Sequence, residues 1–103
     1  MSAREIVDSA IADHKVVVFS KSYCPYCKPT KELLVGELGK DGVTIYEVDE
    51  MAEGSDILAY LKEKTQQEYV PNIFINQRHI GGNDEIQAAK KDGSLAKLLA
   101  LSA

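Results

Sequence analysis

The chain has 103 residues, of which 45% are hydrophobic and 27% charged, and its formal net charge is −4 at pH 7. This length predicts a single domain over residues 1–103; the composition excludes a disordered chain, and the acidic balance argues against a general nucleic-acid binder, which needs a clustered basic face. The longest apolar run is too short to cross a bilayer and charged residues interrupt the first apolar positions, so we expect no secretory leader and a cytoplasmic, reducing location.

The N-terminal region predicts a helix followed by a buried strand. Apolar residues recur at helical spacing at Ile6, Val7, Ala10 and Ile11. Ser2 is placed to cap that helix, because its hydroxyl can accept a hydrogen bond from a backbone N–H of the first turn. The run from Lys15 to Ser20 is continuously rather than alternately apolar, which is typical of a strand buried on both faces.

Both cysteines of the chain come directly after this strand, at the start of a second amphipathic segment. We expect Cys24 in the first helical turn, where unpaired N–H groups and the helix dipole favour a thiolate. Pro25 suits the first helical position. Cys27 would lie on the same helix face as Cys24, close enough for a short disulfide. The spacing therefore predicts thiol–disulfide exchange.

Three lysines, Lys21, Lys28 and Lys31, are near the cysteines in the sequence. Their charges would favour a thiolate and attract an anionic thiol, although exposed lysines are also ordinary surface residues.

Zinc and a structural disulfide are the alternative uses of two cysteines at this spacing. Zinc normally takes four ligands, and the remaining candidates, His14 and His79, have no paired spacing. A structural disulfide usually closes a long loop, whereas Cys24 and Cys27 would close a very short one. Redox chemistry is therefore favoured over both.

The middle of the chain predicts a second strand, a third helix and a hairpin. Residues 43–48 read as a strand, which the intervening helix should place parallel to the first. Ser55 is a possible cap for a helix containing Ile57, Leu58 and Leu61. The run from Asn72 to Ile75 predicts a buried strand, and His79 and Ile80 return as an edge strand after a turn at residues 76–78.

Two glycines precede the predicted fourth helix. Gly81 and Gly82 allow close backbone approach, and Asn83 or Asp84 can cap a helix over residues 85–91. Such a helix start can bind an anion, but it is also a common turn. Gly93 and Ser94 then begin a last helix, whose apolar residues are Leu95, Leu98 and Leu99.

With Cys24-Pro25-Tyr26-Cys27 on the second helix, Val70-Pro71 before the hairpin and Gly81-Gly82-Asn83-Asp84 after it, the chain resembles a dithiol glutaredoxin. The resemblance covers nearly the whole chain. It implies an α/β protein of thioredoxin-like fold, with a four-stranded mixed sheet flanked by helices on both faces. It also implies glutathione-dependent reduction of protein disulfides and of protein–glutathione mixed disulfides.

The resemblance also implies roles for individual residues. Cys24 would be the nucleophile and Cys27 the resolving thiol. The glutathione-binding residues would be Lys21, Tyr26, Gln67, Val70, Pro71, Gly82, Asn83 and Asp84. Of these, Lys21 would meet the glycyl carboxylate, Gln67 would be a neutral donor, and Val70, before a cis proline, would pair its backbone with the peptide. Gly82, Asn83 and Asp84 would hold the γ-glutamyl end, and glutathione would be a co-substrate of a monomer without metal or tightly bound cofactor.

Two positions depart from the family pattern. Tyr69 stands where Thr or Ser is usual, and it would either crowd the groove or add a stacking wall. Glu68 stands where a basic residue is common, so it is expected to weaken the hold on the glycyl carboxylate. Two other functions stay open from the residues alone: an iron–sulfur site, which would need ligands beyond Cys24 and Cys27, and a redox-sensing binding module.

Overall fold

The computed structural model describes residues 1–101, so the last two residues of the predicted domain lie outside the described part. The α-helices of these residues are α1 (Ala3–Asp13), α2 (Cys27–Leu38), α3 (Gly54–Thr65), α4 (Asn83–Asp92) and α5 (Ser94–Ala100). The strands are β1 (Val16–Ser20), β2 (Thr44–Glu47), β3 (Asn72–Ile75) and β4 (Arg78–Gly81). Two short 3₁₀ turns, η1 (Lys40–Gly42) and η2 (Val48–Glu50), flank β2.

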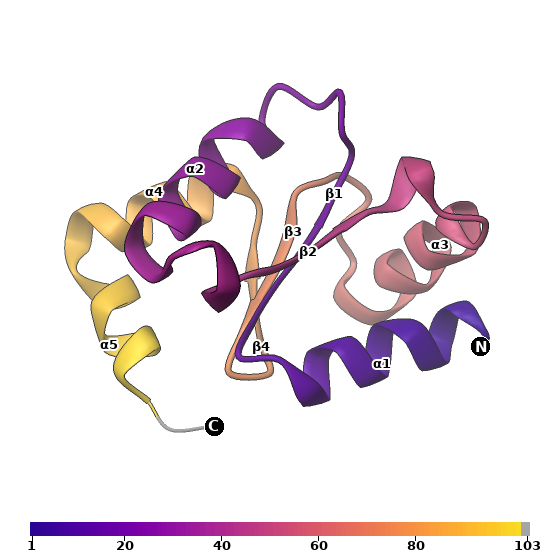
Figure 1. Ribbon diagram of the computed structural model, residues 1–103, viewed down its shortest axis with the longest axis horizontal. Coiled ribbons are helices and arrows are strands. Elements are labelled where there is room, and N and C mark those ends of the chain that lie inside the picture. The colour runs from indigo at the N-terminus through magenta and orange to yellow at the C-terminus, as the bar shows by residue number, and fades with distance from the viewer. Residues whose placement is uncertain (102–103) are drawn as a thin grey trace.

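The strands form one four-stranded sheet in the order β2-β1-β3-β4 (Figure 1). β1 runs parallel to β2, as the strand–helix–strand pattern predicted, and antiparallel to β3, which pairs antiparallel with β4. The predicted mixed sheet is therefore confirmed.

Helices cover both faces of the sheet, because β1 sends alternate side chains into two separate cores. Val17 and Phe19 pack with residues of α1 and α3. Val16 and Val18 pack with residues of α2, α4 and α5 on the other face. All residues of β1 are buried, which explains the unbroken apolar run from Val16 to Phe19. Figure 1 shows the two helical layers on opposite sides of the strands.

The cap predictions had mixed outcomes. Ser2 does cap α1, and it forms a capping box with Glu5. Ser55 does not cap α3, because the helix begins one residue earlier, at Gly54. A Cβ atom on Gly54 would lie 2.0 Å from the carbonyl oxygen of Val48, so only glycine fits at this helix start. α4 begins at Asn83 with Gly82 at the N-cap, so neither Asn83 nor Asp84 is the cap.

The helix after the cysteines also starts later than predicted. α2 begins at Cys27, and the chain from Lys21 to Tyr26 forms turns instead. The N–H of Cys24 donates to the carbonyl of Lys21, and the N–H of Cys27 donates to the carbonyl of Cys24. Pro25 is therefore a turn residue, and Cys24 lies just before the helix rather than within its first turn.

Candidate active site

Strand register brings three distant segments together at one end of the sheet. Phe19 near the end of β1 pairs with Asn72 at the start of β3, so the cysteine loop and the segment before β3 are neighbours. Ile73 pairs with Gly81, which adds the start of α4. The sheet therefore assembles the cysteines, the Val70–Pro71 segment and the Gly82–Asp84 segment.

The cysteine loop is held to the sheet by Asp49. The backbone N–H of Ser22 donates to one carboxylate oxygen at 2.9 Å, and the Ser22 hydroxyl donates to the other. These hydrogen bonds, with a smaller contribution from the charge of Lys21, hold the pKa of Asp49 below its ordinary value. Asp49 lies in η2, directly after β2. Its two hydrogen bonds with Ser22, called the Asp49 clamp below, therefore attach the cysteine loop to the end of a neighbouring strand.

The two thiols have different surroundings. Cys24 is partly exposed, and its thiol donates to the carbonyl oxygen of Val70 at 3.7 Å. Cys27 is fully buried, with 0% of its surface exposed. Burial raises the pKa of Cys27, and the nearby Cys24 raises it further, while hydrogen bonds with the Ser20 side chain and the Lys21 backbone partly oppose the shift. Cys24 is thus the accessible sulfur, and Cys27 stays a thiol at neutral pH.

The Val70–Pro71 peptide bond is cis, as the resemblance implied. Gln67 is buried beneath this segment, and its side-chain amide donates to the carbonyl oxygens of Tyr69 and Pro71, each at 2.9 Å. Both amide hydrogens are therefore engaged within the protein. Gln67 thus supports the segment through hydrogen bonds to its own backbone neighbours, and its expected role as a donor to glutathione stays a prediction.

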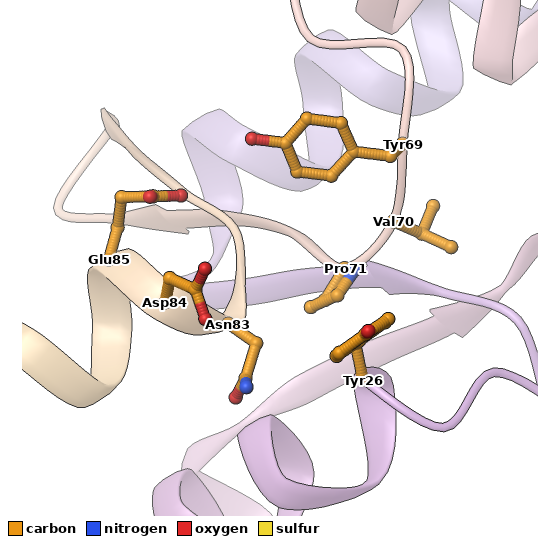
Figure 2. A pocket seen from close by; sticks show the side chains of 7 residues that line it. All are labelled: Tyr26, Tyr69, Val70, Pro71, Asn83, Asp84 and Glu85. Atoms are coloured by element: carbon orange, nitrogen blue, oxygen red, sulfur yellow. The ribbon is translucent and has the colours of Figure 1, made fainter.

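A groove of about 290 Å³ lies beside the cysteines. Its lining residues are Tyr26, Tyr69, Val70, Pro71, Asn83, Asp84 and Glu85. Figure 2 shows the Tyr69 ring on one side of this groove and Tyr26 on the other, with Pro71 between them and Asp84 at the α4 end. Five of the residues predicted to bind glutathione, namely Tyr26, Val70, Pro71, Asn83 and Asp84, therefore line one groove.

The start of α4 offers backbone donors to this groove. The Gly82 N–H donates to the Glu85 carboxylate at 2.7 Å, and the role expected of Gly82 at the γ-glutamyl end stays a prediction. Asn83 and Asp84 are the first two residues of α4, whose N–H groups have no partner within a helix. The site thus combines N–H donors with the carboxylate of Asp84.

Asn83 also ties α4 to the cysteine helix. Its side-chain oxygen accepts hydrogen bonds from the buried Thr30 hydroxyl at 3.0 Å and from the Gln87 amide at 3.2 Å. Thr30 lies one turn after Cys27 in α2. The two helices that form the site are therefore joined next to the groove.

The charged residues near the site are partly paired with one another. Lys31 forms a half-buried ion pair at 2.8 Å with Glu47, the last residue of β2, so its charge is paired within the protein. Lys28 is exposed and Lys21 half-buried, and neither lines the groove. Glu68 is exposed and pairs with Lys62 at 2.8 Å, and that lysine lowers its pKa.

Sequence reasoning missed three features of the site. The Asp49 clamp, the Thr30–Asn83 hydrogen bond and the engagement of Gly82 by Glu85 were not predicted. Only the last had a local signal, because an acidic residue three positions after an N-cap is typical of a capping box.

Among residues 1–101, no three His, Cys, Asp or Glu side chains are grouped so that they could hold a metal ion. Within the same residues, no helix has both the length and the apolar character that crossing a membrane requires.

Comparison with known proteins gives consistent matches. The glutaredoxin family model matches residues 16–80. Glutaredoxin-1 of Rhizophagus irregularis is 47% identical over 97 residues, which cover 94% of each chain. The crystal structure of wheat glutaredoxin superposes with a TM-score of 0.88 at 42% identity, covering 98% of this chain and 93% of that one. A buckwheat glutaredoxin–glutathione complex superposes with a TM-score of 0.87 at 37% identity, covering 94% and 86%.

Proposed function

The chain belongs to the glutaredoxin family, and from this premise we propose that Cys24 and Cys27 use glutathione to reduce two kinds of protein substrate. These are proteins that carry glutathione as a mixed disulfide and proteins with disulfides of their own. The chain is a glutathione-dependent thiol oxidoreductase with a cysteine-pair site, and the residue roles below are our proposal. We take the domain to span residues 1–103.

The unequal exposure of the two sulfurs carries the proposal. An attacking sulfur must reach the substrate disulfide, and Cys24 is the partly exposed thiol beside the groove. A resolving sulfur needs to reach only Cys24, so it can remain buried as Cys27 is.

In the first route, the Cys24 thiolate attacks the glutathione sulfur of a protein–glutathione mixed disulfide. The protein sulfur leaves as a thiolate and takes up a proton, and glutathione is now bonded to Cys24. A second glutathione thiolate attacks the glutathione sulfur of this intermediate, which forms oxidised glutathione and releases Cys24 as a thiolate. Cys27 takes no part in this route.

In the second route, Cys24 attacks one sulfur of a protein disulfide and forms a mixed disulfide with the protein. Cys27 then loses its proton and attacks Cys24, which releases the reduced protein and leaves a Cys24–Cys27 disulfide. Two glutathione molecules reduce that disulfide and become oxidised glutathione. The raised pKa of Cys27 keeps it protonated until this step.

Glutathione carries two carboxylates and one ammonium group, and the groove has matching partners. The N–H groups of Asn83 and Asp84 would hold the γ-glutamyl carboxylate, and the Asp84 side chain would hold the ammonium group. The Val70 backbone would pair with the cysteinyl residue, with Pro71 and Tyr26 as apolar walls. Lys21 would attract the glycyl carboxylate from outside the groove. The buckwheat complex supports glutathione as the ligand of this site.

A turnover assay tests the proposal. A glutathionylated peptide is reduced with glutathione and a coupled glutathione reductase, and a parallel reaction uses thioredoxin reductase as the electron donor. We expect turnover only with the glutathione system. Equal or faster turnover with thioredoxin reductase would contradict the proposed route.

We further propose that the protein acts as a cytoplasmic monomer, without metal or tightly bound cofactor. Size-exclusion chromatography tests the oligomeric state, and an absorption spectrum after anaerobic reconstitution with iron and sulfide tests for a cluster. A coloured dimer would replace this part of the proposal with an iron–sulfur function.

A further inference from the structure

The Tyr69 ring forms one wall of the groove near the start of α4. We propose that Tyr69 determines specificity: it contacts the γ-glutamyl part of the bound thiol and thereby favours glutathione over shorter thiols. This inference rests on the proposed function and names a residue that selects the substrate of that same site.

The position of the Tyr69 ring supports this role. The ring is 59% exposed, yet it lies against the backbone of Gly82. A Cβ atom added to Gly82 would lie 2.9 Å from Cε2 of Tyr69, closer than real Cβ contacts. Figure 2 shows the ring reaching from its backbone toward the start of α4, with its hydroxyl on the Glu85 side. The absence of a side chain at Gly82 thus makes room for an exposed aromatic ring.

Both sides of this contact are fixed by hydrogen bonds. The side-chain amide of Gln67 donates a hydrogen bond to the carbonyl oxygen of Tyr69 at 2.9 Å. The Glu85 carboxylate accepts a hydrogen bond from the backbone N–H of Gly82 at 2.7 Å. Two partly buried hydrogen bonds therefore fix the backbone positions of Tyr69 and Gly82 that place the ring over Gly82. An aromatic wall that is held in place costs little ordering entropy when a ligand binds.

The chemistry of the ligand identifies which part meets the ring. Asp84 and the α4 N–H groups suit the charged atoms of an amino acid, and the ring lines the groove beside them. The γ-glutamyl group has two methylenes between its charged atoms and the peptide bond, and such a stem gains from contact with an aromatic face. A thiol that lacks this group, such as cysteinylglycine, would gain nothing from Tyr69.

The test compares two mixed disulfides on the same peptide, one with glutathione and one with cysteinylglycine. For wild type we expect a lower KM with the glutathione substrate. Tyr69→Ala should raise that KM about three- to tenfold, with kcat within about twofold, and should leave the cysteinylglycine kinetics unchanged. Tyr69→Phe should retain the wild-type KM, because the ring rather than the hydroxyl makes the contact.

Tyr23→Ala is the matched control. Tyr23 is also an exposed tyrosine, at 72%, but it does not line the groove, so its loss should leave both KM values unchanged. If Tyr69→Ala keeps the wild-type KM, or raises KM equally for both substrates, the inference is overturned. If wild type does not distinguish the two substrates, the inference is also overturned. The proposed glutathione function fails only if wild type does not turn over the glutathione substrate, which separates the two failures.

A double-mutant cycle tests the ring's position. Gly82→Ala should raise the KM for the glutathione substrate about fivefold or more when Tyr69 is present, because the new methyl group displaces the ring. In the Tyr69→Ala background the same change should have less than about a twofold effect. If the effects of the two substitutions on KM are additive, the proposed dependence of glutathione binding on the Tyr69–Gly82 contact is wrong. Thermal unfolding of each variant shows whether a KM change comes from the groove or from loss of folded protein.

Discussion

The two ends of the site are built in different ways. The cysteine end is a single segment, residues 20–27, with local turn hydrogen bonds and one distant clamp, Asp49. The groove end combines the segment before β3 and the start of α4 with Tyr26 of the cysteine segment, and these meet only because the strand register aligns them. The reacting atoms are therefore encoded locally, whereas recognition of the thiol depends on the whole fold. Substitutions at the two ends should have separable effects on kcat and KM.

The largest effect should come from Cys24→Ser. A serine hydroxyl does not ionise near neutral pH, so reduction of glutathionylated peptides and of protein disulfides should both be abolished. Coupled turnover assays with the two substrates measure this, and thermal unfolding checks that the variant is folded. Residual turnover of either substrate above about 1% of wild type would assign the attack to another group.

Cys27→Ser should impair reduction of protein disulfides much more than reduction of glutathionylated peptides. Reduction of the glutathionylated peptide should stay within about threefold of wild type, because glutathione itself regenerates Cys24, while reduction of intramolecular protein disulfides should fall by about tenfold or more. The same pair of assays applies. Loss of both activities would favour a thioredoxin-like dithiol mechanism over the glutathione route.

Asp84→Ala should affect the groove end alone. Removing a carboxylate that pairs with an ammonium group should raise the KM for glutathionylated peptide by about tenfold, with little change in kcat. Asp92→Ala, at the far end of α4, is the control and should change neither constant. An equal fall in kcat would mean that Asp84 also supports the reacting sulfur.

Asp49→Ala should affect the cysteine end alone. Without the hydrogen bonds from Ser22 to Asp49 the loop is less ordered, so kcat should fall about three- to tenfold while KM is retained. Glu50→Ala, which removes an exposed carboxylate next in sequence, is the control.

The pKa of Asp49 is lowered in the folded protein, so its contribution to stability is present above its ordinary value of 3.8 and is lost as pH falls through the lower, folded pKa. Tm measured from about pH 5 to pH 2 should therefore fall less steeply in Asp49→Ala than in wild type.

Glu68→Lys should have the smallest effect. The exposed Glu68 is paired with Lys62, so reversing its charge releases Lys62 and adds a cation near the groove. Exposed charges contribute on the order of 1 kcal/mol or less, so KM for the glutathionylated peptide should fall by severalfold at most, and only at low salt. An unchanged KM at low salt would mean that Glu68 points away from the bound thiol.

The sequence predicted the parts of the fold and site that depend on local patterns. The apolar run of β1, the cysteine pair and the glycines before α4 all carry such patterns. The start of α2 was placed too early, because the turn hydrogen bonds of Cys24 and Cys27 replace helical ones and no sequence pattern separates the two. The backbone partners of Gln67 were not predicted for a related reason, since its amide donates to carbonyls two and four residues away.

Long-range polar contacts are the part that could not be predicted. Ser22 and Asp49 are 27 residues apart, and Thr30 and Asn83 are 53 apart. Serine, threonine, aspartate and asparagine occur throughout proteins with many different hydrogen-bond partners, so no sequence pattern marks these four residues as partners. Their pairing follows from the strand register, which the sequence specifies only through the whole set of buried residues.

The burial of Cys27 has a practical consequence for spectroscopy. A maleimide fluorophore or nitroxide spin label added to the reduced, folded protein meets only one accessible sulfur, since the chain has two cysteines and one of them is fully enclosed. A single probe is therefore attached at Cys24 without any engineered cysteine. Such a probe is attached beside Val70, one of the residues that line the groove, and its mobility would report on the surrounding loop.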